Sequence, residues 1–295
     1  PMLRLTADGP SMFPFLFVTI ACGAISGFHG LVSSGTSSKQ LNQLADARMV
    51  GYGGMIGEGT LALASTIAAV AGISLVTRCE LPAVGHIADL NWAVYYDSWA
   101  HASGNKAAAF VLGGGALIES LGVSPALAKT LMAVLVISFA ATTLDTATRI
   151  QRFILAELGS ALSIKVLKNK VVATLSAIIP AMFLVFTNVE DPATGVVKQT
   201  GWALWPIFGA SNQMLAALTL MILTLYFWQK KKPILPLLIP MLFIMFVTVT
   251  SLFINAGQFL KTNSFLFALD IFLIALIIWM IIEGLLTVFY KTRER

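Results

Sequence analysis

Residues 13–35 read FPFLFVTIACGAISGFHGLVSSG, a stretch long enough to cross a bilayer but interrupted near its middle by glycines and polar side chains. A helix in lipid must satisfy its own backbone hydrogen bonds, so such residues are tolerated at membrane depth only where protein or a watery cavity takes over. Transporters place binding sites at broken helices near the midplane. The segment is therefore predicted to be a broken membrane helix at a substrate site, interrupted at Gly23, Ser26, Gly27, His29 and Gly30.

The composition of the whole chain predicts an all-α polytopic membrane protein. Of its 295 residues, 57% are hydrophobic and only 11% are charged, far from the balance of a soluble domain. The net charge of +5 comes from short basic clusters between apolar spans, which is typical of cytoplasmic loops and not of nucleic-acid binding. The two cysteines form no metal-binding spacing.

Runs of about 20 apolar residues predict seven membrane spans in a single transmembrane domain. The stretch 107–122 is too short for a crossing and is predicted to be a re-entrant or surface helix within an outer excursion, 78–123. That excursion is either a lid or a packed surface segment. Residues 147–166 mix basic and apolar side chains, as expected of a helix along the cytoplasmic interface. The spans are 12–35, 49–77, 124–146, 171–189, 201–228, 234–255 and 264–290.

The distribution of positive charge predicts the orientation of these spans. If the chain starts outside, the loops 36–48, 147–170 and 229–233 and the tail 291–295 are cytoplasmic and hold 13 of the 19 Lys and Arg residues. Cytoplasmic loops carry such an excess. The broken segment then runs from outside to inside, and the C-terminus is cytoplasmic.

The order of the elements resembles the second inverted repeat of the LeuT-type, or APC-like, transporter fold. In that fold the broken first helices of two inverted repeats meet at the substrate site. Spans 234–255 and 264–290 are two additional C-terminal helices after that repeat, and the N-terminal repeat is absent from this chain.

Four long strings resemble the carbon starvation protein CstA family, with matching blocks from about residue 9 to residue 228. The resemblance implies a bacterial or archaeal cytoplasmic-membrane importer of peptides or pyruvate-like carboxylates. Transport is expected to be coupled to a proton or sodium gradient, with no other cofactor. Family members carry further helices before the FPFLF segment, so a partner N-terminal half is expected in the same polypeptide or a separate subunit. The strings are FPFLFVTIACGAISGFHGLVSSGT, DARMVGYGGMIGEG, TTLDTATRIQRFILAELG and ALWPIFGASNQMLAALTL.

The broken segment supplies the first candidates for substrate binding. Gly23, Ser26 and Gly27 can expose backbone groups, and the positive end of a half-helix can face a carboxylate. The structural alternative is close helix packing through small residues. A histidine can change its charge near neutral pH, so His29 can carry a coupling proton or bind a substrate carboxylate, or it can be a neutral side chain satisfied by its neighbours.

Glu58 is a candidate proton-coupling residue. It lies nine residues into a span that starts at the inner face, and so roughly 13 Å deep. A carboxylate there must be paired, protonated or hydrated, and such residues are usually functional. The alternative is a structural hydrogen bond from the protonated form. His29 is a possible partner.

Thr142, Thr143 and Asp145 are candidate cation ligands. The family resemblance makes their helix the counterpart of the sodium-binding eighth helix of LeuT-like carriers. The alternatives are threonine hydroxyls bonded back to helix carbonyls, and an aspartate that caps a following helix starting near Thr146.

Asn212 and Gln213 fall near the middle of their span, where amides need partners from the substrate or from neighbouring helices. Trp205 lies near the outer interface and is a candidate outer gate.

Enzyme motifs and metal-binding spacings are missing from the sequence, so catalysis is not expected. The alternative to a transporter is a non-transporting membrane scaffold or sensor subunit that needs a separate N-terminal half.

Overall fold

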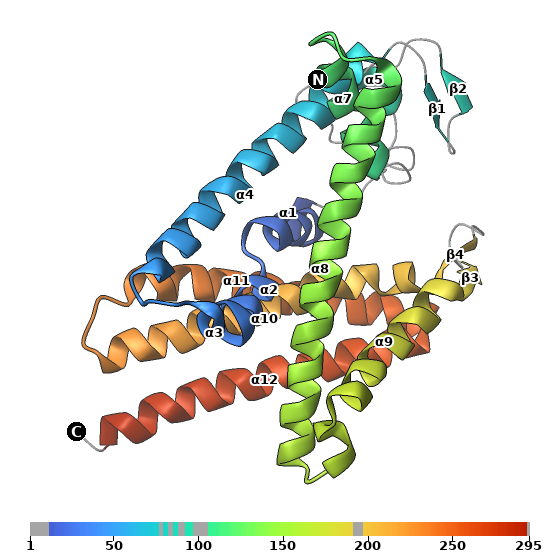
Figure 1. Cartoon of the computed structure of the whole chain (residues 1–295). Coiled ribbons are helices and arrows are strands. Elements are labelled where there is room, and N and C mark those ends of the chain that lie inside the picture. Colours follow the sequence, from blue (N-terminus) through green and yellow to red (C-terminus); the bar gives the residue numbers. More distant parts are fainter. Residues whose placement is uncertain are drawn as a thin grey trace. The chain divides into compact units, whose positions relative to one another are not determined.

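The chain divides into two compact units, and each is described here by itself. The first comprises Gln40–Ala147, and the second comprises Pro10–Lys39 together with Thr148–Arg295. Figure 1 shows their helices in sequence colours. The structure is a computed structural model that describes residues 12–76, 79–81, 85–87, 92–96, 106–190 and 197–293.

Long apolar helices dominate the described residues, so the prediction of a mainly helical multi-pass membrane protein is confirmed. Six segments are long and apolar enough to cross a membrane. The predicted span 171–189 corresponds to α9, Lys170–Phe186, whose 17 residues lie at the short end of the range for a crossing helix. The six segments are Met12–Gln40, Asp46–Val70, Pro125–Ala161, Ile207–Gln229, Leu235–Thr262 and Ser264–Phe289.

The predicted break in the first segment is confirmed. Helix α1, Phe17–Ala24, ends near the middle of the segment, and α2, Gly27–Val32, begins after two non-helical residues. Ser26 has extended backbone angles and caps α2, because its hydroxyl accepts a hydrogen bond from the Phe28 N–H. The segment starts with the π-helix Met12–Leu16 and continues through the π-helix Ser33–Ser37 into α3, Ser38–Gln40.

The first unit contains α4, Asp46–Val70, and α7, Lys106–Glu119, which pack closely near the end of α4. Glycines allow this approach, since a Cβ on Gly72 would meet the carbonyl oxygen of Gly113. The predicted surface helix at 107–122 is thus a 14-residue helix packed on the end of α4. Between them lie the 3-10 turn Gly72–Leu75, the antiparallel strands β1, Cys79–Leu81, and β2, Gly85–Ile87, and the short helix α5, Trp92–Tyr95.

The described part of the outer excursion is packed. Tyr95 is 2% exposed and shares a buried cluster with Ile73, Val76, Ala109 and Ala116. Its ring meets that of Tyr96 edge to face, with centroids 4.9 Å apart. These contacts favour the packed surface segment over the lid.

Tyr96 tests this packing. Its hydroxyl donates to the Ala69 carbonyl at 2.8 Å, near the end of α4. Burial raises the pKa of the Tyr96 phenol, so its stabilising contribution is present below the unfolded-state pKa of about 10 and is lost as pH rises through the folded-state pKa. Tyr96→Phe is expected to lower the free energy of unfolding by about 1 kcal/mol at neutral pH.

Thermal unfolding of purified protein between neutral pH and pH 11 measures this effect. The difference in free energy of unfolding between wild type and Tyr96→Phe should become smaller as the pH approaches 11. Tyr226→Phe, at an exposed tyrosine of the other unit, is the control and should change little. Equal stability of Tyr96→Phe and wild type at neutral pH would contradict the prediction.

Helix α8 runs without interruption over Pro125–Ala161. The predicted separate interfacial helix at 147–166 is therefore wrong in its start, because residues 147–161 continue the helix of span 124–146, and only a short 3-10 turn, Lys165–Lys168, follows. Asp145 lies inside α8 and caps no new helix near Thr146. Without a glycine or proline near residue 146, helical hydrogen bonding simply continues.

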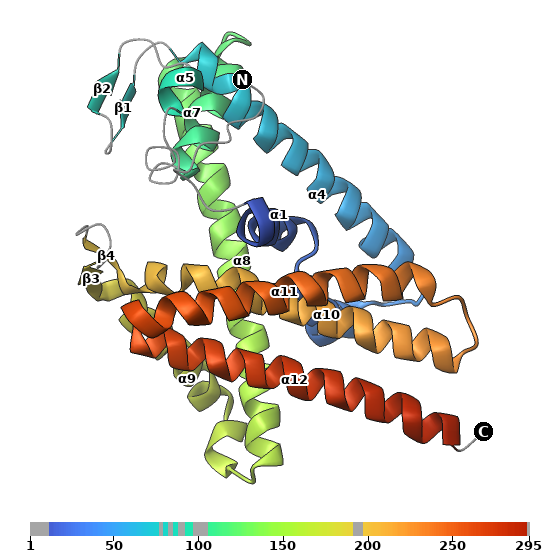
Figure 2. The ribbon, with the colours of Figure 1, turned by 180° about the vertical axis from the view of Figure 1, so that it is seen from behind.

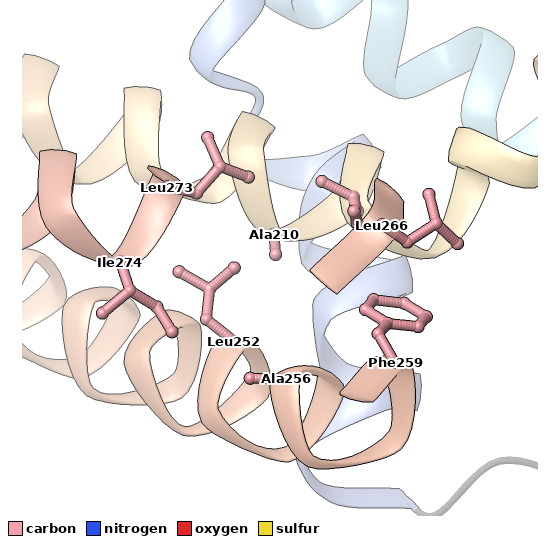
Figure 3. Close-up of a cluster of buried hydrophobic side chains, with 8 residues drawn as sticks. Ala210, Leu252, Ala256, Phe259, Leu266, Leu273 and Ile274 are labelled. Carbon is pink, nitrogen blue, oxygen red and sulfur yellow. The ribbon is translucent and has the colours of Figure 1, made fainter. Parts of the chain in front are cut away.

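The second unit is built on three long helices: α10, Trp205–Gln229; α11, Leu235–Thr262; and α12, Ser264–Arg293. Both α11 and α12 pack against α10, and the three lie side by side in Figures 1 and 2. Their shared core, drawn in Figure 3, contains Ile207, Ala210, Leu252, Ala256, Phe259, Leu266, Leu273 and Ile274. Helix α9 reaches α10 through the antiparallel strands β3, Asn188–Glu190, and β4, Val197–Gln199, and the 3-10 turn Thr200–Leu204.

Candidate functional site

Asn212 of α10 holds the break in the first segment together. Its Oδ1 accepts hydrogen bonds from the Phe28 N–H at 3.0 Å and from the Ser26 hydroxyl at 3.3 Å. Its Nδ2 donates to the Cys22 carbonyl at 3.3 Å and contacts the Cys22 sulfur at 3.0 Å. One buried amide, 5% exposed, thus bonds to the end of α1 and to the start of α2.

These bonds replace those that the helix break removes. In a continuous helix the Cys22 carbonyl would accept from residue 26, and the Phe28 N–H would donate to residue 24. Buried backbone groups without partners are costly, and neither lipid nor bulk water supplies partners at this depth. Asn212 therefore makes the break tolerable in an apolar helix, which is one of the two roles considered for it.

The glycines of the break divide into packed and open positions. A Cβ on Gly27 would collide with the Asn212 carbonyl oxygen, the Leu215 Cβ and the Ala216 nitrogen of α10, so Gly27 allows α2 to approach that helix. Gly30 is packed in the same way, against the Thr219 hydroxyl. Gly23 has no atom within 4 Å of its Cβ position among the described residues. Gly27 therefore serves close helix packing, whereas Gly23 is open among the described residues.

Two N–H groups at the start of α2, those of Phe28 and His29, already have partners. Phe28 N–H bonds to Ser26 and Asn212, and the His29 N–H donates to the Ser26 carbonyl at 3.2 Å. A substrate carboxylate at this end would have to displace those bonds. The His29 side chain itself is exposed.

The neighbours of Asn212 on α10 have different surroundings. Gln213 is 1% exposed, and neither its Nε2 nor its Oε1 finds a hydrogen-bond partner in the described part of the chain. Trp205 is 46% exposed at the start of α10, with its ring stacked on that of Phe208 at 5.6 Å. Trp205 is thus available at the surface of this unit.

Glu58 lies in the first unit, on an open face of α4. Its side chain is exposed, and the glycines Gly51, Gly54 and Gly57 have no atom within 4 Å of their Cβ positions in the described residues. Residues at this spacing lie on one side of a helix. Glu58 belongs to the first unit and His29 to the second, so the predicted pairing of these two residues stays a prediction.

The three candidate cation ligands all lie in α8, where they are exposed. The Thr142 hydroxyl donates to the Ser138 carbonyl at 2.9 Å, which is the structural alternative considered for these threonines. Its oxygen lone pairs remain able to bind a cation. No group of three or more His, Cys, Asp or Glu side chains in the described ranges is arranged to hold a metal ion.

Four residues that the structure places at notable positions were not predicted as site residues: Cys22, Thr219, Asn255 and Asp270. The contacts of Cys22 with Asn212 and of Thr219 with Gly30 join positions about 190 residues apart in sequence, and no local pattern reveals them. Asp270 had a visible signal, because a carboxylate within a long apolar span is a functional candidate by default.

A family model described as "Carbon starvation protein CstA" matches residues 3–251. This chain belongs to the CstA family. The match covers the broken segment and α10, and it ends within α11. The resemblance inferred from the four strings is therefore confirmed.

Individual relatives agree with this assignment. The chain is 31% identical over 244 residues to the peptide transporter CstA of Helicobacter pylori strain J99, covering 72% of this chain and 35% of that protein. It is 32% identical over 273 residues to the pyruvate/proton symporter BtsT of Escherichia coli K12, covering 75% and 37%. It is 31% identical over 274 residues to the peptide transporter CstA of the same strain, covering 79% and 38%.

The chain spans little more than a third of the length of these CstA-family relatives. Their names describe transporters and not enzymes, in agreement with the expectation that this protein is no enzyme. No solved structure matches the chain.

Proposed function

We propose that this CstA-family chain is part of a secondary active transporter that imports peptides or pyruvate-like small carboxylates, driven by a proton or sodium gradient. The proposal places it in the cytoplasmic membrane of a bacterium, with its C-terminus inside. The names of its relatives support both substrate classes, and one of those names specifies a proton.

The observation that carries the proposal is the break between α1 and α2, held by Asn212. A protein that needed only a membrane anchor would have no reason to interrupt this helix and to bury an amide beside the gap. Broken helices whose freed backbone groups are bonded by neighbouring helices line the substrate sites of many transporters.

The order of helices supports a LeuT-like second inverted repeat, followed by α11 and α12 as additions. In such a carrier the first segment would move relative to its surroundings during alternating access. Cation binding would favour the outward-open state, and substrate would then favour closure. Each ligand must bind the two states with different affinities for this mechanism to work.

The open face of α4 supports a need for the rest of the carrier. The exposed glycines Gly51, Gly54 and Gly57 on this face favour contact with another helix, because small residues let helix backbones approach closely. We propose that helices from the remaining part of the carrier cover this face.

For the substrate site, the structure favours the side of the break that carries Gly23. Gly27 is packed against α10, whereas Gly23 is open at the C-terminal end of α1. Helix C-termini carry partial negative charge and attract cations, so a peptide ammonium group fits this end. Ser26, His29, Trp205, Asn212 and Gln213 remain the other proposed substrate contacts.

Coupling residues remain proposals as well. Glu58 and His29 are proposed to carry protons, and Thr142, Thr143 and Asp145 to bind a cation. Glu58 and the three α8 residues belong to the first unit, and His29 belongs to the second.

Uptake into proteoliposomes tests the transporter. The chain is reconstituted alone and together with the remaining helices of the carrier, and labelled pyruvate and tripeptides are offered under proton or sodium gradients. We expect gradient-dependent accumulation of one substrate class, abolished by the matching ionophore. Absence of uptake for every substrate under both gradients would reject the transporter and favour the scaffold or sensor.

Glu58→Gln tests the proton-coupling proposal in the same vesicles. The neutral side chain cannot release a proton, so proton-driven accumulation should fall at least about tenfold while substrate exchange continues, because exchange needs no net proton movement. Glu119→Gln, at another exposed carboxylate of the same unit, is the matched control. An unchanged dependence of uptake on pH in Glu58→Gln would remove Glu58 from the mechanism.

A further inference from the structure

Three of the buried polar side chains in the bundle of α10, α11 and α12 have atoms without a hydrogen-bond partner among the described residues. Asp270 is 0% exposed, Gln213 1% and Asn255 2%. Among the residues that the structure describes, no hydrogen-bond partner is present for either carboxylate oxygen of Asp270, either amide atom of Gln213, or Nδ2 of Asn255. Such groups cost about 1–3 kcal/mol each when they stay unpaired, and native proteins pair nearly all of them.

The turn between α11 and α12 brings two of these residues to the same level. A single residue, Asn263, separates the helices, and its Oδ1 accepts hydrogen bonds from the Phe265 and Leu266 N–H groups. Asn255 lies eight residues before this turn and Asp270 seven residues after it, which is about 12 and 10.5 Å along the two helices. Gln213 lies about 12 Å from the start of α10, at the same end of the bundle.

The three residues also lie on faces that share one core. Asp270 is one turn from Leu266 and from Leu273, and the buried cluster of Figure 3 contains both leucines. Asn255 is one turn from Leu252, and Gln213 is one turn from Ala210, which belong to the same cluster. Each of the three helices thus contributes one polar residue without a complete set of partners to a common interior.

No basic side chain of the packed helices offsets the Asp270 charge. The ionisable side chains of α10 and α11 are Tyr226 and Lys261, and both are exposed. On α12, Glu283 is exposed, and Tyr290, Lys291 and Arg293 lie twenty or more residues beyond Asp270. A buried carboxylate is stable only if it is paired with a positive charge or protonated.

We propose that Asp270 reversibly binds one proton, and that the protonated carboxyl then forms hydrogen bonds with Asn255 and Gln213 that are not present among the described residues. Of the five unpaired atoms, two are amide nitrogens that donate and three are oxygens that accept. Protonation removes the charge of the carboxylate and gives it an O–H donor, while its other oxygen can still accept from an amide N–H. A metal cation would leave the two amide nitrogens unpaired, because an N–H donor cannot ligate it. Asn255 and Asp270 lie beyond the residues that the family model matches.

The role of this proton in coupling rests on the proposed transport function, but its binding does not. Infrared spectroscopy of the purified chain in lipid nanodiscs tests binding directly. At neutral pH the wild type should show the C=O stretch of a protonated, buried carboxyl, and ¹³C-aspartate labelling should shift it. Asp270→Asn, which mimics the neutral acid in size, should remove the band, and Glu283→Gln on the same helix should retain it.

Asn255→Leu should shift the band, because the hydrogen bonds of a carboxyl set its C=O frequency. Absence of a labelled aspartate band in the wild type, or its persistence in Asp270→Asn, would overturn the proposal. Loss of the band on adding sodium at constant pH would also overturn it, in favour of a metal-cation site. The wild-type labelling result stands even if Asp270→Asn does not fold.

Transport assays separate the two proposals. If the infrared band of the protonated carboxyl is observed but no uptake occurs under any gradient, the transport proposal is rejected and the proton-binding proposal stands. If the wild-type protein transports substrate but shows no such band, the proton-binding proposal is rejected and the transport proposal stands. If both hold and Asp270 couples transport, Asp270→Asn should lose at least about tenfold of its proton-driven accumulation and retain exchange, while Glu283→Gln transports normally.

Discussion

Asn212→Leu should both destabilise this protein and stop its transport. The substitution keeps a side chain of similar size but removes the acceptor for Phe28 and Ser26 and the donor to the Cys22 carbonyl. Each partly buried backbone group left without a partner costs about 1–3 kcal/mol, so a loss of about 2–5 kcal/mol in the free energy of unfolding is expected. Uptake should fall to background, because the two half-helices lose the contact that positions them.

Thermal and denaturant unfolding in detergent, with uptake in vesicles, measure these effects. Ser211→Ala is the matched control, because the Ser211 hydroxyl donates only to the Phe208 carbonyl of its own helix, and it should stay within about 0.5 kcal/mol of wild type. Ser26→Ala should lose about 1 kcal/mol as an N-cap change. The double variant should be less destabilised than the sum, since both residues serve Phe28. Stability of Asn212→Leu equal to that of Ser211→Ala would show that the break is held by something else.

Gly27→Ala and Gly23→Ala should change stability in opposite directions, although both add one methyl group to the same broken segment. At Gly27 the new Cβ would overlap backbone atoms of Asn212 and Ala216, which cannot rotate away, so α2 must move off α10. Overpacking of this kind costs about 1–3 kcal/mol. At Gly23 no described atom lies within 4 Å, and alanine in place of glycine within a helix contributes about 0.5–1 kcal/mol.

Unfolding midpoints of the two variants in one detergent test this pair. A third variant, Gly30→Ala, brings its Cβ against the Thr219 hydroxyl, and Thr219→Ala in the same chain should restore most of the lost stability. Equal losses for Gly27→Ala and Gly23→Ala would contradict the assignment of one packed and one open glycine. Uptake by Gly23→Ala provides a separate test of the proposed substrate side.

Much of the first segment could be predicted because its signal is local. Glycines and a serine within 23 otherwise apolar residues marked the break, and the structure places it at Ile25 and Ser26. The span limits followed from apolar run lengths, since the bilayer sets a minimum helix length. The continuity of α8 was missed because its basic and polar residues after 146 suggested an interface, although polar residues with good helix propensity do not end a helix.

The candidate site was also only partly predictable from the sequence. The sequence marked Asn212 as an amide in need of a partner, but that partner could be substrate or another helix, and only the tertiary structure showed that it bonds to both sides of the break. Likewise, adjacent residues Asn212 and Gln213 look alike in sequence. A rotation of about 100° per residue sends one side chain toward α2 and leaves the other buried without partners.

Sequence alone determined the membrane class, the family, and the position of the broken helix, because composition, motif and backbone chemistry are properties of short stretches. Tertiary structure decided which glycine is packed, which amide holds the break and which carboxylate is buried, because each depends on helices far away in the chain. Asp270 combines both: the sequence displays a carboxylate within an apolar helix, and the packing of α10, α11 and α12 leaves it without a basic partner.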